Sequence, residues 1–175
     1  MLEQMVSRAD ADFKAEVEKR YRILSFGGTP LNRHLWENYA GNFNGVCIEF
    51  EVDSQFGPVY AVTYSDAPRR LDLTSIDDFE HLRLTVLVKS TRWSEEREAR
   101  MIFGDPPIDA DQPALVEQRY VFPADRLTGL FVGYKVSRTQ REELLALARA
   151  RSRPVRCYVV RPIPWGTRVW LRRVF

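Results

Sequence analysis

The tract from Lys89 to Phe103 constrains the fold most, because it sets a dense run of charges and one tryptophan directly before an apolar segment. The apolar end predicts a buried strand. If Glu96, Glu98 and Arg100 form the start of this strand, all three side chains lie on one face, since successive side chains alternate. Such a face must pair internally, reach solvent or line a cleft, because unpaired buried charge is costly. This tract is therefore the first candidate for a functional site.

The overall composition is that of a globular protein. The chain has 175 residues, of which 45% are hydrophobic and 29% charged, enough for one domain with a sizeable core. No apolar run approaches the roughly 20 residues of a membrane helix, and the first residues lack the zones of a signal peptide. Cys47 and Cys157 lie far apart in apolar segments, which predicts buried free thiols in a reducing compartment. We expect a cytoplasmic protein that makes no use of a membrane.

Charge is distributed unevenly along the chain. Residues 126–175 contain 12 basic and two acidic residues, whereas residues 1–125 contain 14 basic and 22 acidic ones. A basic half is typical of proteins that bind nucleic acid, an acidic protein or phosphate groups. Alternatively, the two halves neutralise each other within one compact fold. Both interpretations stay open at the level of sequence.

The pattern of elements predicts a single α+β domain over residues 1–175, with a helical segment at 1–20 and a core at 21–175. We expect about four helices and a mixed or mostly antiparallel sheet of about eight short strands. Asn32 is expected to cap the second helix, and Ser137 with Gln140 forms a capping box. The predicted strands are 21–26, 46–52, 59–64, 100–103, 119–122, 127–132, 155–161 and 168–175, and the predicted helices are 2–20, 33–40, 75–87 and 138–150.

No strong catalytic motif is present. The sequence lacks a Walker loop, a G-x-G-x-x-G, a G-x-S-x-G and an H-E-x-x-H motif, and with two histidines and two cysteines we expect no metal site. Trp36 and Tyr39 stand three residues apart on the predicted helix 33–40, and therefore on one face. They belong either to the core or to a stacking platform for a planar ligand, with His34 or Asn38 supplying hydrogen bonds.

The charged tract admits three interpretations. Glu96, Glu98 and Arg100 form surface ion pairs, a buried structural network, or an active-site carboxylate pair. In the third case Arg100 or Lys89 orients an anionic group of the ligand. Trp93 is then either a lid over the site or a core anchor.

Two motifs carry a family resemblance. Residues 35–50 have the pattern Leu-Trp-x-x-Tyr-Ala followed by Gly-Val-Cys-Ile-Glu-Phe, and residues 89–100 have the pattern Lys-Ser-x-x-Trp-x-x-Glu-x-Glu-x-Arg. Both are similar to hallmarks of the prokaryotic family called domain of unknown function 2971, and residues 122–133 are also similar. The resemblance spans residues 21–160.

The chain departs from that family in two respects. Family members begin with an additional segment, containing a Lys-Tyr-Arg strand and an Asn-Asp-Pro-Phe turn, that is missing here. The resemblance therefore implies a short form, a fragment, or half of a larger assembly in which a partner chain supplies this segment. Histidines common in the family are replaced by Asn38 and Phe43, so the roles of those histidines are not carried over.

The layout of this family resembles ADP-ribosyltransferases in outline, which implies NAD as the cofactor and a toxin or phage-defence role. The strand 23–26 with the following aromatic helix would match one element, and the Glu-x-Glu motif another. A carboxylate suits this chemistry because cleavage of the nicotinamide–ribose bond passes through an oxocarbenium-like state. The implied catalytic residues are Glu98, as the catalytic acid, and Glu96, which orients the acceptor; the implied cofactor-binding residues are Trp36, Tyr39, Arg100, Lys89 and His34.

Two other function classes remain. The first is a non-catalytic module that binds nucleic acid or an acidic protein through residues 126–175. The second is a metal-dependent hydrolase or nuclease that uses the glutamate cluster.

Overall fold

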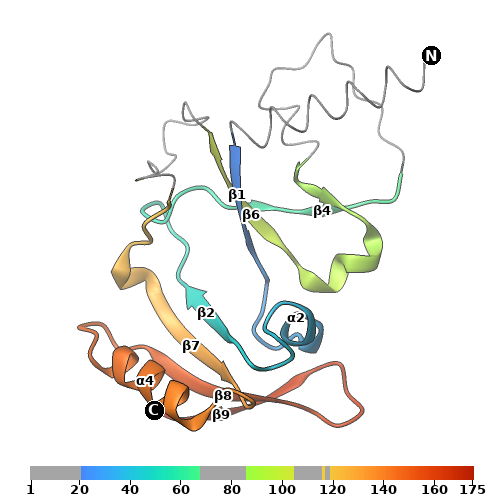
Figure 1. Cartoon of the computed structure of the whole chain (residues 1–175). Helices are drawn as coiled ribbons and strands as arrows, with labels where there is room; N and C mark the ends of the chain where they lie inside the picture. Colours follow the sequence, from blue (N-terminus) through green and yellow to red (C-terminus); the bar gives the residue numbers. More distant parts are fainter. Residues whose placement is uncertain (1–20, 68–85, 105–115, 117–118) are drawn as a thin grey trace, which may run out of the picture. The chain divides into compact units, whose positions relative to one another are not determined.

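The computed structural model describes residues 21–67, 86–104, 116 and 119–175 (Figure 1). These residues combine helices with nine strands in antiparallel and parallel pairs, which confirms the α+β class. They group into two compact units. Unit 1 contains the described residues of Met1–Phe26, Gly57–Ser94 and Glu98–Val121, and unit 2 those of Gly27–Phe56, Glu95–Arg97 and Phe122–Phe175.

Unit 1 is built on a three-stranded antiparallel sheet in the order β1-β6-β3. The central strand β6 (Ala99–Gly104) pairs with β1 (Tyr21–Phe26) and with the short β3 (Tyr60–Ala61). The described residues of unit 1 also contain a parallel pair, β4 (Thr63–Tyr64) with β5 (Val88–Lys89). The buried strand predicted after the charged tract is confirmed, since the buried side chains of β6 are Met101, Ile102 and Phe103.

Unit 2 is built on a four-stranded mixed sheet in the order β2-β7-β8-β9. The central strands β7 (Leu127–Gly133) and β8 (Arg156–Pro162) are parallel, and helix α4 (Arg138–Arg149) connects them. Parallel neighbours require such a crossover, because a tight turn can join only antiparallel strands. The outer strands β2 (Val46–Phe50) and β9 (Val169–Arg173) pair antiparallel with their neighbours.

Each face of this sheet is covered by a different helix. Side chains alternate along a strand, so Leu130 and its cross-strand partner Cys157 share one face, where they pack with Leu145 of α4. The residues next to them, Phe131 and Tyr158, point to the opposite face. That face packs against Trp36 of helix α2 (Arg33–Asn38). Helices α2 and α4 therefore lie on opposite faces of the same sheet.

Most local predictions are confirmed. The Asn32 Oδ1 atom accepts a hydrogen bond from the backbone N–H of His34 at 2.9 Å, and the Ser137 Oγ atom accepts one from Gln140 at 3.3 Å. Both thiols are free, and burial together with the nearby Glu49 carboxylate raises the pKa of Cys47 to about 11. No helix among the described residues is long and apolar enough to span a bilayer.

The strand predicted over residues 119–122 is wrong. Among the described residues, this segment takes part only in an isolated bridge between Val116 and Arg119. The apolar residues there serve packing instead, because the Phe122 ring stacks on Phe50 with centroids 4.4 Å apart. The predicted helix 2–20 lies outside the described residues, as does helix 75–87 apart from its last two residues.

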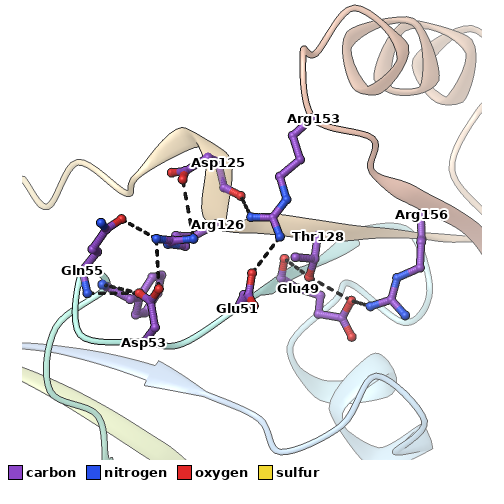
Figure 2. Close-up of polar contacts among 10 residues, drawn as sticks. Glu49, Glu51, Asp53, Gln55, Asp125, Arg126, Thr128, Arg153 and Arg156 are labelled. Carbon is purple, nitrogen blue, oxygen red and sulfur yellow. Dashed lines mark hydrogen bonds and ion pairs between the residues drawn. The ribbon is translucent and has the colours of Figure 1, made fainter.

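Several arginines of the basic half pair with acids inside unit 2, as Figure 2 shows. The acids belong to β2 and to the segment that follows it. Such pairs support the interpretation that the uneven charges neutralise each other within the fold. The pairs are Arg126 with Asp53 at 2.9 Å, Arg153 with Glu51 at 2.8 Å and Arg156 with Glu49 at 2.6 Å.

Candidate functional site

The charged tract does not form one strand. The 3-10 helix η1 (Thr91–Glu96) carries the chain to Glu96, and β6 begins only at Ala99. Between them Arg97 has a φ of +46°, which breaks an extended backbone. The expectation that Glu96, Glu98 and Arg100 share one strand face is therefore wrong. Glu96 belongs to unit 2, whereas Glu98 belongs to unit 1.

Gly28 and Asn32 hold the Glu96 segment in unit 2. The Gly28 backbone N–H donates to the Glu96 carbonyl oxygen at 3.1 Å. A Cβ atom at Gly28 would lie 2.7 Å from the Cβ of Arg97 and 2.8 Å from its carbonyl oxygen, closer than real contacts allow. The Asn32 side chain adds a hydrogen bond from Nδ2 to the carbonyl oxygen of Glu95 at 2.8 Å. Gly28 and Asn32 together fix where Glu96 lies.

This packing makes Gly28→Ala a destabilising change. We expect the free energy of unfolding to fall by about 1–3 kcal/mol, because the new methyl group must displace backbone rather than a flexible side chain. Urea denaturation followed by circular dichroism measures the loss. Gly166→Ala is the matched control, since its Cβ would come no closer than 3.4 Å to any neighbour. Equal losses in the two variants would contradict this account of the segment.

Glu96 is the centre of a polar cluster in unit 2. Its side chain is only 4% exposed, and its Oε1 atom accepts a hydrogen bond from the Tyr39 hydroxyl at 3.2 Å. The His34 Nε2 atom lies 3.5 Å from the same oxygen. The Asn38 Nδ2 atom, a donor, is 3.1 Å from His34 Nδ1, which places the proton of a neutral ring on Nε2, facing Glu96. We call Glu96, Tyr39 and His34 the Glu96 cluster.

Tyr39 combines a hydrogen-bonded hydroxyl with a largely exposed side chain. It is the C-cap of α2, and its backbone N–H donates to the carbonyl oxygen of Leu35 at 2.9 Å. The residue is 66% exposed, although its hydroxyl is bound to the buried Glu96 carboxylate. An aromatic side chain that is hydrogen-bonded at its polar end and largely exposed can stack on a planar ligand.

Trp36 does not share this position, and the stacking role predicted for it is wrong in this structure. The side chain is 2% exposed, and its Nε1 atom donates to the Pro30 carbonyl oxygen at 2.8 Å. Its ring stacks on Phe43 with centroids 5.8 Å apart and an interplanar angle of 10°. Trp36 therefore has no exposed ring face for a ligand and serves the core. Phe43 is a core residue as well, 1% exposed, and the sequence pattern around it does not indicate this role.

Glu98 is the centre of a second cluster, in unit 1. The side chain is 7% exposed and accepts hydrogen bonds from Lys89 Nζ at 3.0 Å and from Arg100 Nε and Nη2 at 2.7 and 3.0 Å. Its backbone N–H donates to the Tyr64 hydroxyl at 2.8 Å. Burial raises the pKa of Glu98, but hydrogen bonds from Arg100, Ser25 and Lys89 outweigh burial and lower the pKa to about 2. We call Glu98, Lys89 and Arg100 the Glu98 brace.

The geometry of the Glu98 brace favours a structural role. Both carboxylate oxygens of Glu98 are engaged, and Arg100 also donates to the carbonyl oxygen of Val86. Lys89 lies 5.5 Å from the centroid of the Trp93 ring, and Arg92 lies 5.0 Å from it. These contacts support the interpretation of a buried network and not that of surface ion pairs. Trp93 is half-buried and contacts these two cations of its own unit.

Six of the seven predicted site residues thus fall into two clusters, and Trp36 belongs to neither. Within the described ranges, no group of three or more His, Cys, Asp or Glu side chains can hold a metal ion, so nothing there supports the metal-dependent alternative.

Comparisons with known proteins assign no family: no family model, curated protein or solved structure matches the chain. Among the described residues, the Glu96 cluster joins an exposed aromatic residue to a buried carboxylate and is the candidate site.

Proposed function

We propose that the protein is an ADP-ribosyltransferase-like domain that binds NAD, with the nicotinamide stacked on Tyr39 beside Glu96. The observation that carries this proposal is the exposed Tyr39 ring, whose hydroxyl is anchored 3.2 Å from the buried Glu96 carboxylate. The family resemblance of residues 35–50 and 89–100 supports the same assignment. The acceptor, and a role in a toxin or phage-defence system, follow from that resemblance alone and stay predictions.

The charge of the ligand fits the Glu96 cluster. The nicotinamide ring of NAD is planar and positively charged, and a cation is attracted to the electron-rich face of a tyrosine ring. The hydrogen bond from Tyr39 to Glu96 increases the electron density of the phenol. The carboxylate also brings a negative group close to the stacked ring. The cluster therefore favours the cationic ring of NAD over a neutral aromatic ligand.

The same electrostatics suit the reaction. When the bond between nicotinamide and ribose breaks, its electron pair stays on the nicotinamide nitrogen, and the ribose becomes oxocarbenium-like. The acceptor then forms a bond to that ribose carbon and loses a proton. A negative group held in a site of low dielectric stabilises the positive charge that develops. In this proposal Tyr39 contacts the ligand, while Glu96 and His34 position Tyr39 and supply the local charge.

The proposal changes the role of Glu98. The resemblance implied Glu98 as the catalytic acid, but the Lys89 and Arg100 side chains engage both of its carboxylate oxygens. A carboxylate bound in this way serves the stability of unit 1. Lys89 and Arg100, expected to hold the phosphates of NAD, are engaged in the same brace. The proposed ligand contacts therefore come from unit 2.

NAD binding and nicotinamide release by the purified chain test the proposal. We expect Tyr39→Ala to weaken NAD binding by about 5- to 150-fold, because stacking on an aromatic ring is worth about 1–3 kcal/mol per base. Tyr39→Phe keeps the ring but loses the anchor, so its affinity should lie between those of wild type and Tyr39→Ala. Glu96→Gln should slow nicotinamide release more than it weakens binding, since it removes charge and keeps shape.

Glu37→Gln is the matched control, because Glu37 lies on the same helix but pairs with Arg33 at 2.6 Å, away from the Glu96 cluster. Circular dichroism verifies that each variant folds. Absence of NAD binding and of nicotinamide release in the wild type would overturn the proposal. So would a Tyr39→Ala variant that binds NAD as well as Glu37→Gln does.

A further inference from the structure

A cavity of about 320 Å³ lies in unit 2 where the first two turns of α4 meet β8 and β9. Its volume falls at the lower end of the range of ligand pockets, which suits a ligand the size of a mononucleotide. Figure 1 shows α4 lying along the sheet, on the side opposite α2. The cavity is therefore separate from the Glu96 cluster, which lies on the α2 side.

Periodicity explains which side chains line this cavity. Arg138, Arg141 and Leu145 follow a spacing of three and four residues, which places them on one face of α4. On the sheet, Arg172 of β9 lies directly opposite Val159 of β8. A cross-strand pair shares one face, so Arg172 projects to the same side as Val159, toward α4.

The lining is basic. It contains three arginines and one acid, Glu142, whose carboxylate pairs with Arg138 at 2.8 Å. Across the part of the chain that the structure describes, neither Arg141 nor Arg172 has an ion-pair partner, in contrast to the arginines of Figure 2. Two guanidinium groups without an acid, facing one cavity, attract an anion. Their planar fork matches the oxygens of a phosphate group.

The floor of the cavity is apolar. Leu145 is 8% exposed and Val159 is 2% exposed, and both offer aliphatic surface beneath the arginines. A fully hydrated anion gains nothing from such a floor, whereas a ligand that joins a phosphate group to a flat apolar body contacts both parts. A nucleotide has this chemistry.

We propose that this cavity binds a nucleoside monophosphate group, with the phosphate between Arg141 and Arg172 and the base over Leu145 and Val159. The group is either a free nucleotide or the 5′-phosphorylated end of a nucleic acid, since both present the same chemistry. This site is distinct from the proposed NAD site, and it gives a specific location to the expectation that residues 126–175 bind nucleic acid.

Isothermal titration of the full chain with adenosine 5′-monophosphate tests the site. We expect Arg141→Gln and Arg172→Gln each to weaken binding about tenfold, because each removes a charge-assisted hydrogen bond. Arg173→Gln is the matched control. Arg173 is the next residue of β9 and lies opposite Tyr158, so it points to the other face of the sheet. Binding should also weaken with added salt.

Comparison of probes identifies the chemistry and the source. Adenosine and inorganic phosphate should each bind more weakly than adenosine 5′-monophosphate, since each supplies only half of the contacts. A 5′-phosphorylated oligonucleotide that binds more tightly than the mononucleotide points to a nucleic-acid end, and equal or weaker binding points to the free nucleotide. If adenosine binds as tightly as its monophosphate, or if Arg173→Gln weakens binding as much as Arg172→Gln, the proposal is overturned.

Discussion

Replacement of Trp36 by alanine is expected to lower the free energy of unfolding by about 4 kcal/mol. The indole is 2% exposed, stacks on Phe43 and donates a hydrogen bond to Pro30. Truncation would therefore remove a large buried apolar surface, leave a cavity beside Phe131 and orphan a carbonyl group. Urea denaturation followed by circular dichroism gives the measurement.

Trp165→Ala provides the control for this prediction. Trp165 is fully exposed, so its replacement should change the free energy of unfolding by less than about 0.5 kcal/mol. The pair of variants also separates the two roles once predicted for Trp36. If Trp36→Ala had the same free energy of unfolding as Trp165→Ala but no longer bound NAD, the core assignment would be wrong. Trp36 would then be a stacking residue for the ligand.

Features that depend on near neighbours along the chain were predictable. The caps at Asn32 and Ser137 need only a side-chain oxygen a few residues from a free backbone N–H, and the structure has both. The buried strand β6 follows from an apolar run whose length matches a strand. These elements are encoded locally, so a single sequence is enough to find them.

The turn at Arg97 was not predictable, although it decides the site. The alternation of Glu96, Glu98 and Arg100 is that of a strand, but the left-handed backbone of Arg97 interrupts the extended chain between Glu96 and Glu98. Gly28, about 70 residues earlier, is the contact that accommodates this turn. A conformation that depends on so distant a contact leaves no trace in local periodicity.

The different burial of Trp36 and Tyr39 was also not predictable from their spacing. A spacing of three residues places side chains on one face only while the helix continues. Helix α2 ends at Asn38, so Tyr39 is its C-cap, and this last residue is largely exposed whereas Trp36 is buried. The roles of the arginines in residues 126–175 were likewise not predictable from the sequence. Strand register determines which of them form ion pairs with acids and which, such as Arg172, line a cavity.

Glu98→Gln is expected to lower the free energy of unfolding by about 3 kcal/mol at pH 7. The change leaves Lys89 and Arg100 without their carboxylate in a site that is largely closed to solvent, and a broken buried ion pair is strongly destabilising. Glu142→Gln is the matched control, because Glu142 pairs with Arg138 on the open surface, where such pairs contribute less than about 1 kcal/mol. Similar losses in the two variants would contradict the brace.

The effect of Glu98→Gln should also depend on pH in a defined direction. The pKa of Glu98 falls from an ordinary 4.5 to about 2 in the folded protein, so the carboxylate stabilises the fold above pH 4.5 and loses this effect as the pH falls toward 2. A protonated Glu98 is nearly isosteric with glutamine and carries no charge. The difference in unfolding free energy between wild type and Glu98→Gln, measured by urea denaturation at a series of pH values, should therefore shrink toward zero between pH 4.5 and 2. A difference that stayed constant across this interval would show that Glu98 contributes through its shape and not through its ion pairs.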